Sequence, residues 1–414
     1  MTEKKNSFWT LRYTLLNITY FAAFCTIHAY AAVYLLSCGF TNTEVGILLA
    51  LANITSAICQ PLIAGKIDGP GPLSNRGFIL FSVTAIMCGS VLLMILPANK
   101  LFIFVIYAFI YMIQFAYQPV MTALCFEYQK AGCSIYYGLA RGMGSAGFAL
   151  TSAFIGRIVE KSGSGILLWV NIISMILSAI IILFFKKPDA DNIKKSDPSD
   201  PHESENGANT DSESPSGKIA HNGFISFTKT YPSFMLFLAG TICFFFAHNM
   251  INDFMIQIIR NLGGGEAQLG YANFLQAILE LPVMALIGFV LKKITSDKLL
   301  LLSGVAFLVK ILILVFAGNM TVMYLSQSFQ LFAYAVFIPA AAYYVSENMQ
   351  ELDQVKGQAY VTSAITLGGV FSNLLSGVIL DNAGIRAMLL TGSAVCAAGV
   401  IIAFMALGGK KHAS

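Results

Sequence analysis

The candidate functional residues of this 414-residue chain are charged side chains inside long apolar runs. Arg141 lies near the start of the glycine-rich run 137–163, and Glu280 lies inside the apolar run 268–291. A charge at the centre of a bilayer costs about 2.5–3.5 kcal/mol by insertion scales, so it usually faces a partner or a wet cavity. The two residues therefore predict a polar site within a membrane protein.

Two amide side chains share a helical face with Glu280. Asn273 and Gln276 precede it by seven and four residues, and residues at that spacing lie on one side of a helix. Three polar groups on one face favour the wall of a water-filled cavity, and we predict substrate binding or proton coupling there. The alternative is a structural ion pair that only satisfies the Glu280 carboxylate.

Other titratable side chains in apolar runs could carry a proton. The candidates for proton coupling are Glu280, Asp253, His248 and Lys310. A hydrogen-bonded packing role fits His248 equally well. His28 lies in the first apolar run among tyrosines, and we predict that it lines the cavity as a hydrogen-bond donor, although simple packing would also account for the tyrosines.

These side chains must be positioned by helices that cross a bilayer, and the composition indicates such helices. Hydrophobic residues make up 57% of the chain and charged residues 11%, against about 25% charged residues in soluble domains. Runs of about 20 apolar residues with short polar breaks are typical of transmembrane helices. The all-α prediction is twelve spans, near 11–37, 44–66, 77–97, 101–126, 137–160, 165–186, 232–258, 268–291, 299–317, 321–346, 357–380 and 385–407.

One polar stretch divides the spans into six and six. Residues 188–228 are rich in Ser, Asp, Asn, Pro and Gly and cannot bury enough surface to fold. We predict a flexible cytoplasmic linker there, between an N-terminal bundle of residues 1–187 and a C-terminal bundle of residues 229–414. Most of the 25 Lys and Arg residues fall on the side that the termini share, which predicts cytoplasmic termini and a location in the cell (inner or plasma) membrane.

A spacing of small and acidic residues occurs twice. Separations of 9, 4 and 3 residues join Gly147, Gly156, Glu160 and Gly163, and they recur 221 residues later at Gly368, Gly377, Asp381 and Gly384. Gly46 and Gly270 are related by a similar offset of 224. Two near-equal offsets predict two halves of the same direction, as in transporters built from parallel repeats. The copy has Thr362 where Arg141 would fall, which favours a functional role for the arginine.

A Gly/Pro-rich turn between spans two and three carries Asp68 and Arg76. It resembles the G-x-x-x-D-x-x-G-R-K loop of the major facilitator superfamily, with Ala64 in place of the first glycine and an enlarged turn at 70–74. Charge-assisted contacts between the two residues could clamp one closed state, so we predict a gating pair. The alternative is that Arg76 only lies where positive charge belongs.

The segment YGLARGMGSAGFAL resembles the helix-five signature of the oligosaccharide:proton symporters, the lactose permease group. The matching residues are Arg141, Gly144, Gly147 and Phe148. The resemblance implies that the arginine binds sugar hydroxyls, that the aromatic residue stacks on the sugar ring, and that Glu280 accepts sugar hydroxyls. Phe148 stands where the group usually has tryptophan, which leaves the substrate open.

The chain departs from lactose permease at its proton machinery. The helix-four acid would fall at Ala123, and the nearest acid is Glu127, one turn further along. The Lys, His and Glu positions of span ten hold Gln327, Gln330 and Ala333, while Lys310 replaces an arginine. We count Gln330 among the predicted substrate ligands. Arg141 precedes Glu160 by 19 residues, about 28 Å along a helix, which predicts a place nearer the cytoplasmic end than the resemblance implies.

The predicted function is alternating-access, proton-coupled uptake of a sugar, oligosaccharide or glycoside, with the proton gradient as energy source and no cofactor. A nucleoside symporter or a drug-efflux antiporter of the same fold is the alternative, and a solute-sensing receptor is a further one. No hydrolase, P-loop or metal-ligand motif occurs, so we predict neither an enzyme nor a metal site. We expect a monomer with no nucleic-acid partner, whose eight scattered cysteines are buried hydrophobes.

Overall fold

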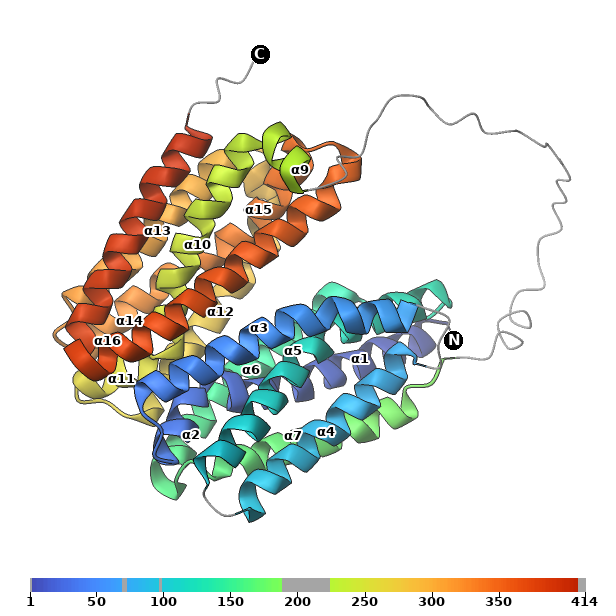
Figure 1. The fold of residues 1–414 in the computed structure, drawn as a ribbon. Helices are drawn as coiled ribbons and strands as arrows, with labels where there is room; N and C mark the ends of the chain where they lie inside the picture. The colour runs from blue at the N-terminus through green and yellow to red at the C-terminus, as the bar shows by residue number, and fades with distance from the viewer. Residues whose placement is uncertain (1, 69–72, 97–98, 188–223, 409–414) are drawn as a thin grey trace, which may run out of the picture.

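The computed structural model describes residues 2–68, 73–96, 99–187 and 224–408, and these form helices joined by short turns (Figure 1). The predicted linker lies mostly outside the described residues, and the boundaries of the two predicted bundles stay predictions. The first group of helices is α1 (Thr2–Phe24), η1 (Cys25–Ala29), α2 (Ala31–Ser37), α3 (Asn42–Asp68), α4 (Asn75–Ile95), α5 (Lys100–Lys130), α6 (Tyr137–Ser162) and α7 (Ile166–Phe184).

The second group begins after the linker. It consists of α9 (Phe224–Thr230), α10 (Pro232–Asp253), α11 (Met255–Asn261), α12 (Glu266–Leu291), α13 (Ser296–Val315), α14 (Met320–Ser328), η2 (Phe329–Leu331), α15 (Tyr334–Asn348) and α16 (Glu351–Leu407). We call the two groups the N-terminal half and the C-terminal half.

The spans follow the predicted pattern. Among the described residues, eight helices are long and apolar enough to cross a membrane, or nine if the bent pair of α1 and α2 counts as one. Helix α16 passes through Gly384, whose φ of 78° breaks it into two arms. Helices α6 and α12, of 26 residues each, are not among these eight. Counting α16 twice and adding these two gives the twelve spans.

Large apolar side chains face outward on the bundle, as lipid contact requires. Phe154, Ile401 and Leu62 are each more than 60% exposed. Polar side chains cap the first turns of several helices. The Ser74 hydroxyl accepts a hydrogen bond from the backbone N–H of Gly77 at the start of α4, and the Asn319 side-chain oxygen accepts one from the backbone N–H of Val322 at the start of α14. Apolar surfaces and capped ends thus define the spans locally.

The two halves meet at one end and separate at the other (Figure 1). They separate where α1 begins and α16 ends, and they meet where α3 crosses the first arm of α16 and where α6 crosses α12. We call the end where they meet the closed end and the end where they separate the open end.

Glycines of the sequence repeat allow this close approach. A Cβ atom on Gly46 would overlap the carbonyl oxygen of Asn373, and one on Gly270 would overlap that of Ser152. On the opposite helices, Gly377 faces the carbonyl of Asn42 and Gly156 faces that of Glu266. The repeated spacing therefore builds two equivalent helix crossings between the halves.

Two helices break at related positions beside the interface. The first span turns through π-helical η1 and bends by 51° around Tyr30, whose φ and ψ are −110° and 16°. Helix α10 ends at Phe254 with φ and ψ of −113° and 23°, and Phe254 follows Tyr30 by 224 residues. The predicted spans 11–37 and 232–258 are thus each interrupted. Neither position holds glycine or proline, so neither the residue type nor the hydropathy indicates a break there.

Candidate functional site

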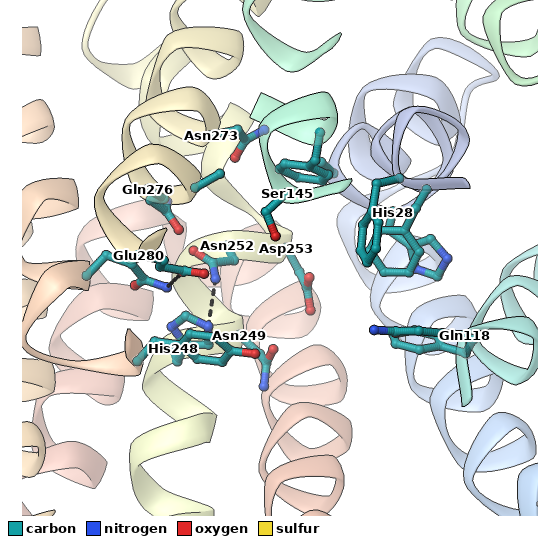
Figure 2. A pocket seen from close by; sticks show the side chains of 18 of the residues that line it. His28, Gln118, Ser145, His248, Asn249, Asn252, Asp253, Asn273, Gln276 and Glu280 are labelled. Atoms are coloured by element: carbon teal, nitrogen blue, oxygen red, sulfur yellow. Dashed lines mark hydrogen bonds between the residues drawn. The ribbon is translucent and has the colours of Figure 1, made fainter. Parts of the chain in front are cut away.

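A cavity of about 430 Å³ lies between the two halves, and side chains of both line it (Figure 2). Helices α10 and α12 supply most of its polar groups, while α1, α5 and α6 supply most of its aromatic rings. The labelled polar lining consists of His28, Gln118, Ser145, His248, Asn249, Asn252, Asp253, Asn273, Gln276 and Glu280. The cavity thus has one amide- and acid-rich wall and one aromatic wall.

Arg141 lines this cavity, in the second turn of α6. Its Nη1 donates to Ser145 Oγ at 2.9 Å, and its guanidinium lies 4.2 Å from the centre of the Phe21 ring. None of the ion pairs among the described residues includes Arg141. Its position near the open end of the bundle agrees with the estimate from helix length, yet the cavity extends far enough to reach it.

Glu280 lines the same cavity from α12 of the C-terminal half, at the end of a chain of hydrogen bonds. Gln330 Nε2 donates to Glu280 Oε1 at 2.9 Å, and Lys310 Nζ donates to Gln330 Oε1 at 2.7 Å. Glu280 and Gln330 line the cavity, whereas Lys310 is fully buried behind them. A buried cation needs a compensating charge. We infer that Gln330 connects Lys310 to the carboxylate that compensates it.

Asn273 and Gln276 also line the cavity from α12. Gln276 Nε2 donates to Gln327 Oε1 at 2.7 Å, so Gln276 is held in place from α14. The structure therefore brings three predicted polar residues of α12 to one wall.

His248 and Asp253 reach the cavity from α10. His248 Nε2 lies 2.9 Å from Asn252 Nδ2, and its ring stacks on Tyr334 at 5.1 Å between centroids. Asp253 is the last residue of α10, directly before the break at Phe254. The C-terminal end of α10 thus brings a carboxylate to the cavity.

His28 and Phe148 belong to the aromatic wall. The His28 ring lies 3.8 Å from the ring centres of both Phe24 and Tyr111. Both His28 ring nitrogens are shielded, and Gln114 of α5 is the polar side chain beside the ring. In this conformation the His28 ring is packed among aromatic rings, and its role as a hydrogen-bond donor to the substrate stays a prediction.

Several lining residues were not among the sequence candidates: Asn53, Gln118, Ser145, Asn249, Asn252 and Tyr334. Asn249, Asn252 and Asp253 recur at helical spacing on α10, and Ser145 follows Arg141 by four residues. That periodicity was the signal available for Asn249, Asn252 and Ser145. The other three carry no pattern that separates them from packing residues.

The hydrogen-bond chain gives a stability prediction. Gln330→Met removes the described acceptor of a fully buried ammonium group and also a donor to the Glu280 carboxylate, and hydrogen bonds to charged groups contribute about 1.5–3 kcal/mol. We expect the free energy of unfolding to fall by about 2 kcal/mol. Gln327→Met, which removes a bond between two amides, is the matched control and should cost about 1 kcal/mol. The free energy of unfolding is measured by denaturant titration in detergent. An equal decrease in the two variants would show that Gln330 does not stabilise the Lys310 ammonium group.

Comparison with known proteins identifies the architecture. The model of the MFS_1 like family matches residues 9–390. The chain belongs to this family. It is therefore a transporter of the major facilitator superfamily, a multi-pass membrane protein and not an enzyme. No curated protein sequence matches it.

Solved structures share the major facilitator fold along nearly the whole chain. A point mutant of the nucleoside transporter NupG has a TM-score of 0.75 at 14% identity, covering 97% of this chain and 99% of its own. A bacterial homologue of the drug peptide transporters PepT1 and PepT2 gives 0.67 at 11% identity, covering 98% of each chain. A bacterial homologue of the lysosomal transporter Spinster, inward-facing and unoccupied, gives 0.62 at 13%, covering 98% and 96%. These likenesses show the fold, and the resemblance to the lactose permease group stays a prediction.

The predicted gating residues of this major facilitator protein lie at the open end. Arg76 donates from Nε to the carbonyl of Ile182 and from Nη2 to that of Leu183, each at 3.1 Å. It therefore caps the C-terminus of α7 in this conformation. Asp68 ends α3, and its side chain is outside the described residues. Their pairing stays a prediction.

Glu127, the substitute for the helix-four acid, also lies away from the cavity. It accepts a hydrogen bond from Asn75 Nδ2 at 3.0 Å and lies 3.8 Å from Lys187 Nζ. In this conformation it joins helix ends and does not pair with Arg141.

Proposed function

We propose that this transporter takes up a neutral, hydroxyl-rich small molecule, a sugar, oligosaccharide or glycoside, together with a proton. The observation that supports this most is that Arg141 of the N-terminal half and Glu280 of the C-terminal half line one cavity. A guanidinium donates to hydroxyl oxygens and a carboxylate accepts from hydroxyl hydrogens, and both make stronger hydrogen bonds than neutral groups. Asn273, Gln276 and Asn252 add groups that can do either.

Alternating access follows from the shape of the bundle. The cavity lies between halves that touch at one end and separate at the other (Figure 1). Because the positive-inside rule favours cytoplasmic termini, the open end would face the cytoplasm. We therefore propose that this is the inward-open state, and that the two halves rock about the site to expose it to the outside.

Proton coupling is proposed for the acids of the same cavity. Glu280 lies where substrate hydroxyls would bind, so proton and substrate would act on one group. Asp253 is the second candidate, and His248 the third. Lys310 would act indirectly, by holding Glu280 charged through Gln330.

A nucleoside is the second candidate substrate, favoured by the aromatic wall. Phe24, Tyr111, Phe115 and Phe148 line one side of the cavity, and flat rings stack well on such surfaces. The fold also resembles that of a nucleoside transporter. A nucleoside would place its base on this wall and its ribose hydroxyls on the polar wall.

The test is a thermal-shift screen of the purified transporter with sugars, glycosides, nucleosides and lipophilic cations, followed by uptake into proteoliposomes. A sugar or glycoside that raises the melting temperature and accumulates under an imposed pH gradient supports the proposal. Stabilisation by nucleosides alone supports the second candidate, and stabilisation by lipophilic cations alone would indicate an exporter. Binding without accumulation would indicate a receptor.

Arg141→Lys should weaken binding of the substrate that the screen finds. Lysine keeps the charge but loses the planar pair of donors, and we expect about a tenfold higher Kd, or about 1.4 kcal/mol. Arg157→Lys is the control, because Arg157 lies on the same helix but outside the cavity, over the Tyr271 ring. A wild-type Kd for Arg141→Lys, measured by isothermal titration calorimetry, would remove Arg141 from the site.

A further inference from the structure

We propose that Asp381 is a gating residue for transport: its carboxylate holds the closed end shut by binding the first turn of α3. Asp381 lies on the first arm of α16, three residues before the break at Gly384, and α3 belongs to the other half (Figure 1). The residue lies outside the cavity, and this role goes beyond substrate binding and proton coupling.

The contact uses both oxygens of the carboxylate. Asp381 Oδ1 accepts from the backbone N–H of Asn42 at 3.2 Å and from its Nδ2 at 2.8 Å. Asp381 Oδ2 accepts from the backbone N–H of Thr43 at 2.7 Å and from its Oγ1 at 2.6 Å. One acid of the C-terminal half thus receives four donors from two residues of the N-terminal half.

The donors are ones that α3 cannot satisfy itself. Asn42 and Thr43 are the first two residues of α3, and the first N–H groups of a helix have no partner within it. The start of a helix also carries partial positive charge, which favours a carboxylate. When the halves separate at this end, these donors must exchange the carboxylate for water, so the contact favours the closed arrangement.

Neighbouring contacts hold the same turn of α3. Gln257 Nε2, from α11 of the C-terminal half, donates to Asn42 Oδ1 at 2.8 Å. Gly377, one turn before Asp381, has no side chain to hold α16 away from the Asn42 carbonyl. Asn42 is therefore fixed from two helices of the other half, and the carboxylate reaches it because Gly377 permits close contact.

The equivalent acid of the repeat makes no such contact. Glu160 precedes Asp381 by 221 residues and lies near Gly265, the residue directly before α12. The Gly265 N–H is already bonded to Gln268 Oε1 at 2.8 Å, and Glu160 receives no hydrogen bond among the residues that the structure describes. Close packing and the Arg157 guanidinium over the Tyr271 ring hold the α6–α12 crossing, whereas packing and a carboxylate that accepts from four donors hold the α3–α16 crossing. This difference assigns the gating role to Asp381 and makes Glu160 its natural control.

Hydrogen–deuterium exchange of the full chain in nanodiscs tests the proposal without any substrate. If Asp381 holds the gate, Asp381→Asn should speed amide exchange at the start of α3, residues 42–46, and also at the start of α12, residues 266–270. We expect an increase of about tenfold at both, because a population shift exposes both crossings together. Glu160→Gln should leave both rates unchanged.

Faster exchange confined to residues 42–46 would overturn the proposal, because it would make Asp381 only a helix cap. Unchanged exchange at both sites would overturn it as well. Asp381→Ala is the second variant, since asparagine retains one acceptor oxygen. A substrate screen that finds no sugar or nucleoside would not affect either result, so the gating role and the proposed function are tested separately.

Discussion

Glu280→Gln should abolish accumulation of substrate driven by a pH gradient while leaving exchange of substrate across the membrane. If one proton moves with each substrate, one unit of pH gradient is worth about 1.36 kcal/mol and gives about a tenfold accumulation. The amide introduced by this substitution cannot take up that proton, but it keeps the shape of the side chain and its place beside Gln330. We therefore expect a final concentration ratio near one, with counterflow preserved.

The measurement is uptake into proteoliposomes at imposed pH gradients, with counterflow at equal pH as the control for binding and rocking. Asp253→Asn is the comparison variant, because Asp253 lines the same cavity and is the other candidate acid. Full accumulation by Glu280→Gln together with loss in Asp253→Asn would transfer the coupling role to Asp253.

Because Glu280→Gln also leaves the buried Lys310 without its compensating charge, the variant should lose stability. The double variant Glu280→Gln/Lys310→Met should recover it, since replacing both members of a buried charge pair costs less than breaking the pair.

Gly46→Leu should nearly stop transport by preventing the halves from meeting at the closed end. A Cβ atom at this position would overlap the carbonyl oxygen of Asn373, and backbone cannot move aside as a flexible side chain would. Overpacking of this kind costs about 1–3 kcal/mol, and the cost applies only to the closed arrangement. We expect uptake to fall by up to about 100-fold while substrate binding persists.

The matched control for this variant is Gly65→Leu. Gly65 lies on the same helix, and no atom beyond its own stretch of that helix lies within 4 Å of the position that its Cβ would take. Uptake should stay near the wild-type rate. Normal uptake by Gly46→Leu would show that the α3–α16 crossing does not need to close this tightly during transport.

Hydropathy predicted the spans because lipid imposes the same requirement on every one of them. A long apolar run is needed wherever a helix crosses the bilayer, so span limits can be estimated from local sequence. The repeat of Gly46, Gly156, Gly270 and Gly377 was equally visible, since close helix crossings need small residues. What the spacing could not show was that all four glycines lie at crossings between the halves.

The candidate site was predictable in part, for a related reason. Arg141 and Glu280 stand out because charge is rare in a spanning helix. Gln330 stands out less, and its position between Lys310 and Glu280 depends on η2, a short irregular turn set by packing. The breaks at Tyr30 and Phe254 likewise follow from tertiary contacts and not from local residue type.

The buried position of Lys310 has a consequence for the electrical behaviour of the carrier. With neutral histidines, the charges in and behind the cavity are Arg141, Lys310, Glu280 and Asp253, and these cancel when both acids are ionised. The empty carrier would then reorient without moving net charge. A carrier loaded with one proton would carry one positive charge, on which a membrane potential of 100 mV exerts about 2.3 kcal/mol. Uptake should therefore respond to voltage as well as to pH, whereas return of the empty carrier should not.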